Sequence, residues 1–300
     1  MAERTSFYEH IESNIWKSRL LILIVLGLII FLGYLIGLFF IGVFPGVFLA
    51  VVLGIIFILI GYFAGDNIIL TSTGAVPTTK QAHPHLWNTV EGLSMAAGIP
   101  MPKVYIVNDT AINAFATGRD YKHASVTVTQ GALNKLNRQE LEGVIGHELS
   151  HIKNYDVRFM MLTTILVGLV VLLSDFFLRM FIFGGGRNRE GKGVHPVFIV
   201  FALILAILTP IIGELMKLAI SRKREYLADA NGALLTRYPP GLANALKKIR
   251  DDKEPLVEAA NKATASLWIE NPLRNKKVLF RSLFSSHPDV NDRIKKLENM

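Results

Sequence analysis

The run His147-Glu-Leu-Ser-His151 combines residue types and a spacing that suit a metal ion. Residues four apart lie on one face of a helix, so His147 and His151 can offer imidazole nitrogens to the same ion. Glu148 falls beside the histidines and inside the apolar arc of this helix, which shields its carboxylate from water. Such a carboxylate suits a general base, and the motif predicts metal-assisted hydrolysis. The alternative is a pair of surface histidines on an amphipathic helix.

A hydrolytic zinc site needs a third protein ligand, and the run REYLAD supplies two candidate acids, Glu225 and Asp229. They lie four apart on one expected helix, where Ala228 and Gly232 are small enough to let another helix approach. We expect Glu225 to bind the metal and Asp229 to accept a hydrogen bond from a ligand imidazole. The alternative is that both acids pair with neighbouring arginines on a solvated face.

Two further features are candidates for substrate binding. The run INAFATG alternates as an exposed strand edge does, and such an edge can hold an extended substrate through main-chain hydrogen bonds. This predicts a substrate-binding role for Asn113, Ala114 and Phe115, with an ordinary sheet edge as the alternative. His287 could stabilise charge that develops during cleavage, with a structural or surface histidine as the alternative.

The elements around the motif are predicted to be mostly helical. Asn137 with Glu140 three residues later indicates a helix start, so we expect a helix over residues 138–154. Asp156 is five residues beyond His151 and should have rotated away, so we expect it to end that helix or to pair with Arg158. We expect a helix over residues 86–97, and the β-like runs KVYIV, INAFATG and ASVTVTQ predict a small antiparallel sheet.

Composition places part of the chain in lipid. A mean hydropathy of +0.38 and 51% hydrophobic residues are high for a soluble protein. Four apolar segments, residues 20–44, 46–64, 159–183 and 194–217, are long enough to cross a bilayer. Four spans put both long polar stretches on one side, and their basic residues predict that this side is the cytoplasm. The net charge of +8 then suits lipid headgroups, and we expect no nucleic-acid partner.

This reading divides the chain into four parts. Residues 1–64 form a tail with two transmembrane helices, and residues 65–158 a cytoplasmic part with the small sheet and the HExxH helix. Residues 159–217 hold two more transmembrane helices and a short external loop, and residues 218–300 a cytoplasmic helical part with the third metal ligand. The chain has no cysteine, which excludes thiolate ligands and fits a reducing compartment.

Several motifs together resemble those of the HtpX family of membrane-bound zinc metalloproteases, distant relatives of the CAAX prenyl endopeptidases. They are HELSH before an apolar segment, EYLAD after the next one, NAFATG upstream and HPDVNDRI near the end, and the resemblance covers essentially the whole chain. It implies an α-rich integral membrane protein with a cytoplasmic zincin-like α+β domain. In that domain, His147, His151 and Glu225 would hold one zinc ion and Glu148 would be the catalytic base.

The resemblance also implies a biological role. The expected substrates are misfolded or damaged membrane proteins and unfolded polypeptides, cleaved at the cytoplasmic side of the inner membrane. One alternative function is a metal-bound membrane adaptor without hydrolysis, which the presence of Glu148 argues against. The other is a metal transporter, which would need ligands inside the spans, where Asp175 and Glu214 lie near opposite ends.

Overall fold

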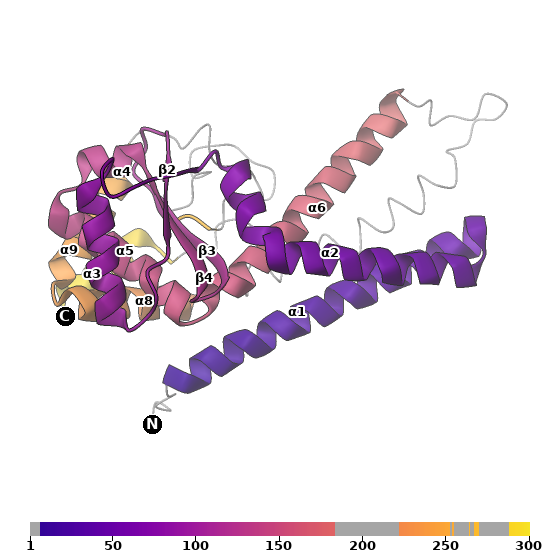
Figure 1. The fold of residues 1–300 in the computed structure, drawn as a ribbon, viewed down its shortest axis with the longest axis horizontal. Helices are drawn as coiled ribbons and strands as arrows, with labels where there is room; N and C mark the ends of the chain where they lie inside the picture. Colours follow the sequence, from indigo (N-terminus) through magenta and orange to yellow (C-terminus); the bar gives the residue numbers. More distant parts are fainter. Residues whose placement is uncertain (1–6, 184–221, 253, 255–263, 265–266, 270–287) are drawn as a thin grey trace.

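A mixed β-sheet with helices packed against it forms one part of the molecule, and long helices extend from it (Figure 1). The structure, a computed structural model, describes residues 7–183, 222–252, 254, 264, 267–269 and 288–300. The predicted fourth span at residues 194–217 and the candidate His287 lie outside the described residues.

The first two apolar segments form a pair of helices that lie side by side (Figure 1). They are α1 (Phe7–Ile36) and α2 (Val43–Ser72), joined through a π-helical turn at Gly37–Ile41. The two helices approach closely at small residues: a Cβ atom on Gly33 would lie 2.2 Å from the Cβ of Ala50. Close contact through glycine and alanine is a usual way for helices to associate in a bilayer.

Within the part of the chain that the structure describes, two helices are long and apolar enough to cross a membrane. They cover Ile11–Phe31 and Val43–Ser72, and only 22% and 17% of their most apolar windows are buried inside the molecule. A core helix of a soluble protein would be mostly buried, so these apolar surfaces suit lipid. The predicted third segment coincides with α6 (Asp156–Phe183), a helix of 28 residues. Because the fourth predicted segment lies outside the described residues, the four-span topology stays a prediction.

The sheet has four strands in the order β1-β2-β4-β3. These strands are β1 (Val76–Pro77), β2 (Lys103–Val107), β3 (Ala114–Asp120) and β4 (His123–Thr129). The expectation of a wholly antiparallel sheet is wrong, because β2 and β4 pair in parallel. The chain crosses from β2 to the far edge before it forms the β3–β4 hairpin, and β4 then returns between the two strands. That pairing is non-local, and the two-residue β1 was not predicted.

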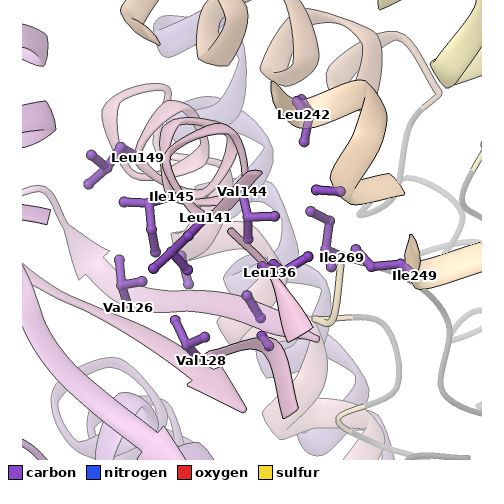
Figure 2. Close-up of a cluster of buried hydrophobic side chains, with 14 of the residues drawn as sticks. Val126, Val128, Leu136, Leu141, Val144, Ile145, Leu149, Leu242, Ile249 and Ile269 are labelled. Atoms are coloured by element: carbon purple, nitrogen blue, oxygen red, sulfur yellow. The ribbon is translucent and has the colours of Figure 1, made fainter. Parts of the chain in front are cut away.

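Helix α5 (Arg138–Lys153) carries the HELSH motif and begins at the predicted capping box. The backbone N–H of Glu140 donates to the Asn137 side chain at 3.0 Å, and the Asn137 N–H donates to the Glu140 carboxylate at 2.8 Å. The apolar face of α5 packs on β4 in the main core, as Figure 2 shows. The α5 and β4 side chains in this core include Leu141, Val144, Ile145, Leu149, Val126 and Val128.

Four further helices surround α5 and the sheet: α3 (Pro84–Ala97), α8 (Arg222–Thr236), α9 (Pro239–Asp251) and α11 (Val290–Glu298). A short helix, α4 (Gln130–Lys135), follows β4. Proline lacks the N–H that the first turn of a helix leaves unused, so Pro239 starts α9 at little cost. Helices α8, α9 and α3 all contact α5, which therefore lies at the centre of this part of the molecule.

Candidate metal centre

The two motif histidines lie next to each other on the buried side of α5. His147 is 1% exposed and His151 is 4% exposed, and their Nε2 atoms are 3.2 Å apart. Glu225, in the first turn of α8, extends its carboxylate toward both rings. Its oxygens lie 3.8 Å from the His147 Nε2 atom and 3.5 Å from the His151 Nε2 atom. All three candidate ligand atoms fall within 4.8 Å of one another, close enough to hold one ion.

Small residues at the crossing of α5 and α8 explain how Glu225 comes so close. A Cβ atom on Gly232 would lie 2.8 Å from the His147 backbone nitrogen and 3.1 Å from the Gly146 carbonyl carbon. Ala228, one turn earlier on α8, is fully buried. The prediction that Ala228 and Gly232 let another helix approach is therefore confirmed.

The Nδ1–H group of each histidine donates a hydrogen bond to a carboxylate. The Nδ1 atom of His147 lies 2.9 Å from Asp229 Oδ1, and the Nδ1 atom of His151 lies 3.0 Å from Asp156 Oδ2. With both Nδ1 protons used in this way, the two Nε2 lone pairs face each other beside the Glu225 carboxylate. Three electron-rich donors this close repel one another unless a cation or a proton lies between them. The donor set of two imidazoles and one carboxylate fits zinc.

The charges around the two histidines differ. Burial opposes a charged His151, but its hydrogen bond to Asp156 and the charges of Glu225 and Asp156 raise its pKa to about 9. Burial lowers the pKa of His147, although its hydrogen bond to Asp229 works in the other direction. Without a metal, a single proton on His151 would therefore bridge the two Nε2 atoms. That proton occupies the place that a cation can take.

Asp156 belongs to this cluster, and the expectation that it turns away from the histidines is wrong. Helix α5 ends at Lys153, and Tyr155 takes a left-handed backbone conformation with φ at 61°. This turn reverses the rotation of the chain and brings the Asp156 carboxylate back under His151. The helix phase used for the prediction does not continue past Asn154. The expected partner Arg158 instead donates to the carbonyl of Arg119.

Arg293 on α11 is a second residue that the sequence reasoning missed. Its guanidinium is fully buried and donates to both oxygens of Asp229, at 2.9 and 2.7 Å. It also donates to the Ile269 carbonyl at 3.1 Å and lies 3.5 Å from a Glu225 oxygen. Burial alone would raise the pKa of Asp229, but Arg293 and the hydrogen bond from His147 lower it to about 2. The signal in the sequence was an arginine on the apolar face of an amphipathic helix.

Glu148 lies beside the histidines, 2% exposed, between α5 and β3. The backbone N–H of Ala116 on β3 donates to its carboxylate. Burial raises the pKa of Glu148 to about 7, against the opposing charge of His151. A carboxylate with a pKa near neutrality can both take and return a proton, as a general base requires.

The predicted substrate strand lies at the edge of the sheet but is not exposed. Asn113, Ala114 and Phe115 are 4%, 0% and 0% exposed, because α5, α6 and α2 all pack against β3. The Ala114 carbonyl accepts a hydrogen bond from the Ile269 N–H at 3.0 Å. Trp268 stacks edge-on against Phe115 with ring centroids 4.7 Å apart. A segment of the chain itself therefore occupies this position.

Metal-assisted hydrolysis is the chemistry that this donor set and the adjacent glutamate serve best. The fold and the site thus define the class of the protein as a metal-dependent hydrolase joined to apolar helices that suit a membrane.

Comparisons with known proteins lead to the same class. The sequence profile of Peptidase family M48 matches residues 80–300. A "Protease HtpX homolog" from Dictyoglomus thermophilum is 46% identical over 98% of this chain and 95% of the relative. A relative with the same description from Caldanaerobacter subterraneus is 41% identical over 100% of this chain and 99% of its own length. The chain belongs to peptidase family M48, and the resemblance to the HtpX family is confirmed.

A solved structure shares the fold. The crystal structure of Ste24p from S. mikatae superposes with a TM-score of 0.52 at 20% identity, covering 97% of this chain and 67% of that chain. The protein is a membrane metalloprotease, and these relationships do not favour a metal-bound adaptor or a metal transporter.

Proposed function

We propose that this metalloprotease is a zinc-dependent endopeptidase that cleaves misfolded or damaged membrane proteins at the cytoplasmic side of the inner membrane. The observation that carries the proposal is the buried convergence of His147, His151 and Glu225, with both imidazole Nδ1 atoms bound by carboxylates. In this proposal the chain crosses the membrane four times and is divided into the four parts predicted from the sequence. The catalytic part faces the cytoplasm.

Each residue has a role in this proposal. His147, His151 and Glu225 hold one zinc ion, and Asp229 orients His147. Bound zinc supplies Lewis-acid chemistry, which acidifies water and polarises a peptide carbonyl. Glu148 takes the proton from the attacking water and delivers it to the leaving amine nitrogen. Its burial and its pKa of about 7 favour both transfers near neutral pH.

Substrate binding is proposed for the edge strand β3. Main-chain hydrogen bonds to Asn113, Ala114 and Phe115 would not depend on the substrate's sequence, which suits a protease for unfolded polypeptides. The Asn113 N–H and carbonyl already bond to Thr129, and the Ala114 N–H donates to the Asn113 side chain. The Ile269 N–H already uses the Ala114 carbonyl. A substrate strand that pairs there must displace that bond. His287 stays a prediction as a group that stabilises charge during cleavage.

Zinc content and proteolysis of the full-length protein in detergent micelles test the assignment. We expect Glu148→Gln to lower casein cleavage by about 10²- to 10⁴-fold while it keeps one zinc per chain, because Glu148 moves protons and does not hold the metal. Glu225→Ala is expected to lose both zinc and cleavage.

Glu142→Gln is the matched control for the catalytic variant. Glu142 is on the same helix but partly exposed, and it pairs with Arg138 at 2.9 Å. We expect this change to leave zinc content and cleavage as in the wild type. Undiminished cleavage by Glu148→Gln, or a wild type without bound metal, would disprove the assignment.

A further inference from the structure

A polar residue lies buried in the first membrane helix. Asn14 is in the candidate span Ile11–Phe31 and is 3% exposed. Its side-chain amide donates to Asp156 Oδ1 at 2.8 Å and to the Asn154 carbonyl at 2.9 Å. Burial of an amide costs free energy unless its hydrogen bonds are made, so Asn14 is suited to this one position of α1 against the start of α6.

The hydrogen bonds of Asn14 continue to the metal centre. Asp156 uses its two oxygens separately: Oδ1 accepts from Asn14, and Oδ2 lies 3.0 Å from the Nδ1 atom of His151. Arg224 Nη1 also approaches Oδ1, at 3.4 Å. A single carboxylate therefore joins the first membrane helix to a candidate metal ligand that lies more than one hundred residues away in the sequence.

Asn14 also holds the turn that presents Asp156. Its two acceptors, the Asn154 carbonyl and the Asp156 carboxylate, flank Tyr155, whose backbone is left-handed with φ at 61°. A non-glycine residue in this conformation is unfavourable by roughly 1–2 kcal/mol, so the turn needs support from its surroundings. Asn14 bonds to both sides of the turn and provides that support.

Apolar packing sets the position of Asn14. Buried residues on α1 recur at the spacing of one helix face: Asn14, Ser18, Leu21 and Val25. Leu21 and Val25 line a small apolar cavity of about 30 Å³ together with α6 residues that include Leu162 and Leu166. Contacts within the membrane therefore decide how the Asn14 amide meets Asp156.

We propose that Asn14 is a positioning residue for the metal centre: through Asp156 it fixes the orientation of the His151 imidazole. This inference rests on the proposed role of His151 as a metal ligand. It makes the first membrane helix part of the support of the active site as well as an anchor in the bilayer. The packing of α1 against α6 then influences how tightly the metal is held.

Zinc affinity of the full-length protein, measured by competition with a chelator, tests the inference. Loss of an outer-shell partner typically weakens metal affinity by about 10- to 100-fold. We expect Asp156→Asn to fall in that range and Asn14→Ala to lose about tenfold, at its lower end. Because Asn14 acts through Asp156, Asn14→Ala should add less than about twofold in the Asp156→Asn background.

Ser18→Ala is the matched control, because Ser18 lies on the same buried face one turn later and its hydroxyl donates to the Asn14 carbonyl. We expect it to keep wild-type zinc affinity. Asn14→Asp keeps the side-chain shape and removes the donor, so it should weaken zinc binding at least as much as Asn14→Ala.

Three outcomes would overturn the inference: wild-type zinc affinity in Asn14→Ala, an undiminished effect of Asn14→Ala in the Asp156→Asn background, or aggregation of both Asn14 variants. The last would mean that the contact serves the fold as a whole. His151→Ala separates this failure from that of the proposed function. If His151→Ala bound zinc as the wild type does, the ligand assignment itself would be wrong.

Discussion

His147 and His151 have carboxylate partners that differ in how much of their charge is neutralised. Asp229 shares its charge with the fully buried Arg293, whereas Asp156 receives an amide from Asn14 and a longer contact from Arg224. The pKa of His147 is accordingly lowered by burial, whereas that of His151 is raised to about 9. The two imidazoles thus respond differently to pH although both are buried on one helix face.

The raised pKa of His151 predicts how zinc binding depends on pH. Below pH 9 the metal-free protein carries a proton on His151, and zinc must displace it. We expect the apparent zinc affinity to fall by at least about tenfold for each pH unit from pH 8 to pH 6. Chelator competition at fixed ionic strength measures this slope. Zinc affinity that stays constant over the same interval would contradict a protonated His151.

The raised pKa of His151 also makes the stability of the metal-free protein depend on pH. The folded pKa of His151, about 9, lies above its usual 6.5, so the folded state binds this proton more tightly than the unfolded state does. The stabilisation from this group is fully present below pH 6.5 and is lost as the pH rises through 9. Bound zinc would take the place of this proton.

Arg293→Gln should destabilise the protein, because it leaves the Asp229 carboxylate buried without its guanidinium partner. Breaking a buried pair in this way costs about 3–5 kcal/mol in the free energy of unfolding. Denaturant unfolding of the zinc-free protein in detergent measures the loss. Arg138→Gln is the control: it removes an exposed pair with Glu142, worth about 0.5 kcal/mol or less. Equal losses in the two variants would contradict a structural role for Arg293.

Residue types and helix spacing predicted only part of the cluster that the structure brings together. Four-residue spacing put His147 near His151, and small residues predicted the close approach of the helix that carries Glu225 and Asp229. Asp156 was missed because a single left-handed residue, Tyr155, breaks the helix phase. Arg293 and Asn14 were missed for another reason. Their contacts join segments far apart in the chain, and no spacing rule specifies such pairs.

At the scale of elements, the crossing of α5 and α8 decides whether a metal can be held. Gly232→Ala places a methyl group 2.8 Å from the His147 backbone nitrogen, and α8 must move away to relieve the clash. We expect Glu225 to move with it and zinc affinity to fall by about tenfold or more. Chelator competition measures this change alongside thermal unfolding.

Gly92→Ala in α3 is the control for that substitution. A Cβ atom on Gly92 would meet nothing within 4 Å, so the change should stabilise the protein by up to about 1 kcal/mol and leave zinc affinity unchanged. A Gly232→Ala protein with wild-type zinc affinity would mean that the crossing tolerates a wider separation than the structure indicates.

Local signals predicted the helices better than the sheet. The Asn137–Glu140 capping box specified the start of α5, and the run KVYIV matched β2 over its full length. Strand order could not be predicted in the same way, because β4 inserts between β2 and β3 through contacts made by distant segments. The alternation in INAFATG predicted an exposed edge, yet helices α2, α5 and α6 pack against β3, so even Asn113 and Thr117 in this run are buried.

At the scale of the whole molecule, the four-span topology predicts which loops face the cytoplasm and which face the outside. Because the sequence has no cysteine, single introduced cysteines can report the side on which each loop lies. Single cysteines can be introduced by Lys80→Cys, on the proposed cytoplasmic side, and by Asn188→Cys, in the proposed external loop. We expect a membrane-impermeant maleimide to modify only the Asn188→Cys protein in intact spheroplasts. Both proteins should react after lysis, which controls for accessibility. Labelling of the Lys80→Cys protein in intact spheroplasts would contradict the orientation.

If substrates pair with β3 as proposed, the bond between the Ile269 N–H and the Ala114 carbonyl has a consequence for the kinds of polypeptide the enzyme can engage. Ile269 belongs to the same chain as β3, so it competes for this position at a high effective concentration that dilution does not lower. A short peptide free in solution has to outcompete it from micromolar amounts. A protein confined to the same bilayer is itself concentrated near the strand, and a long unfolded stretch offers many registers. Discrimination between such proteins and free peptides can therefore arise without any side-chain pocket.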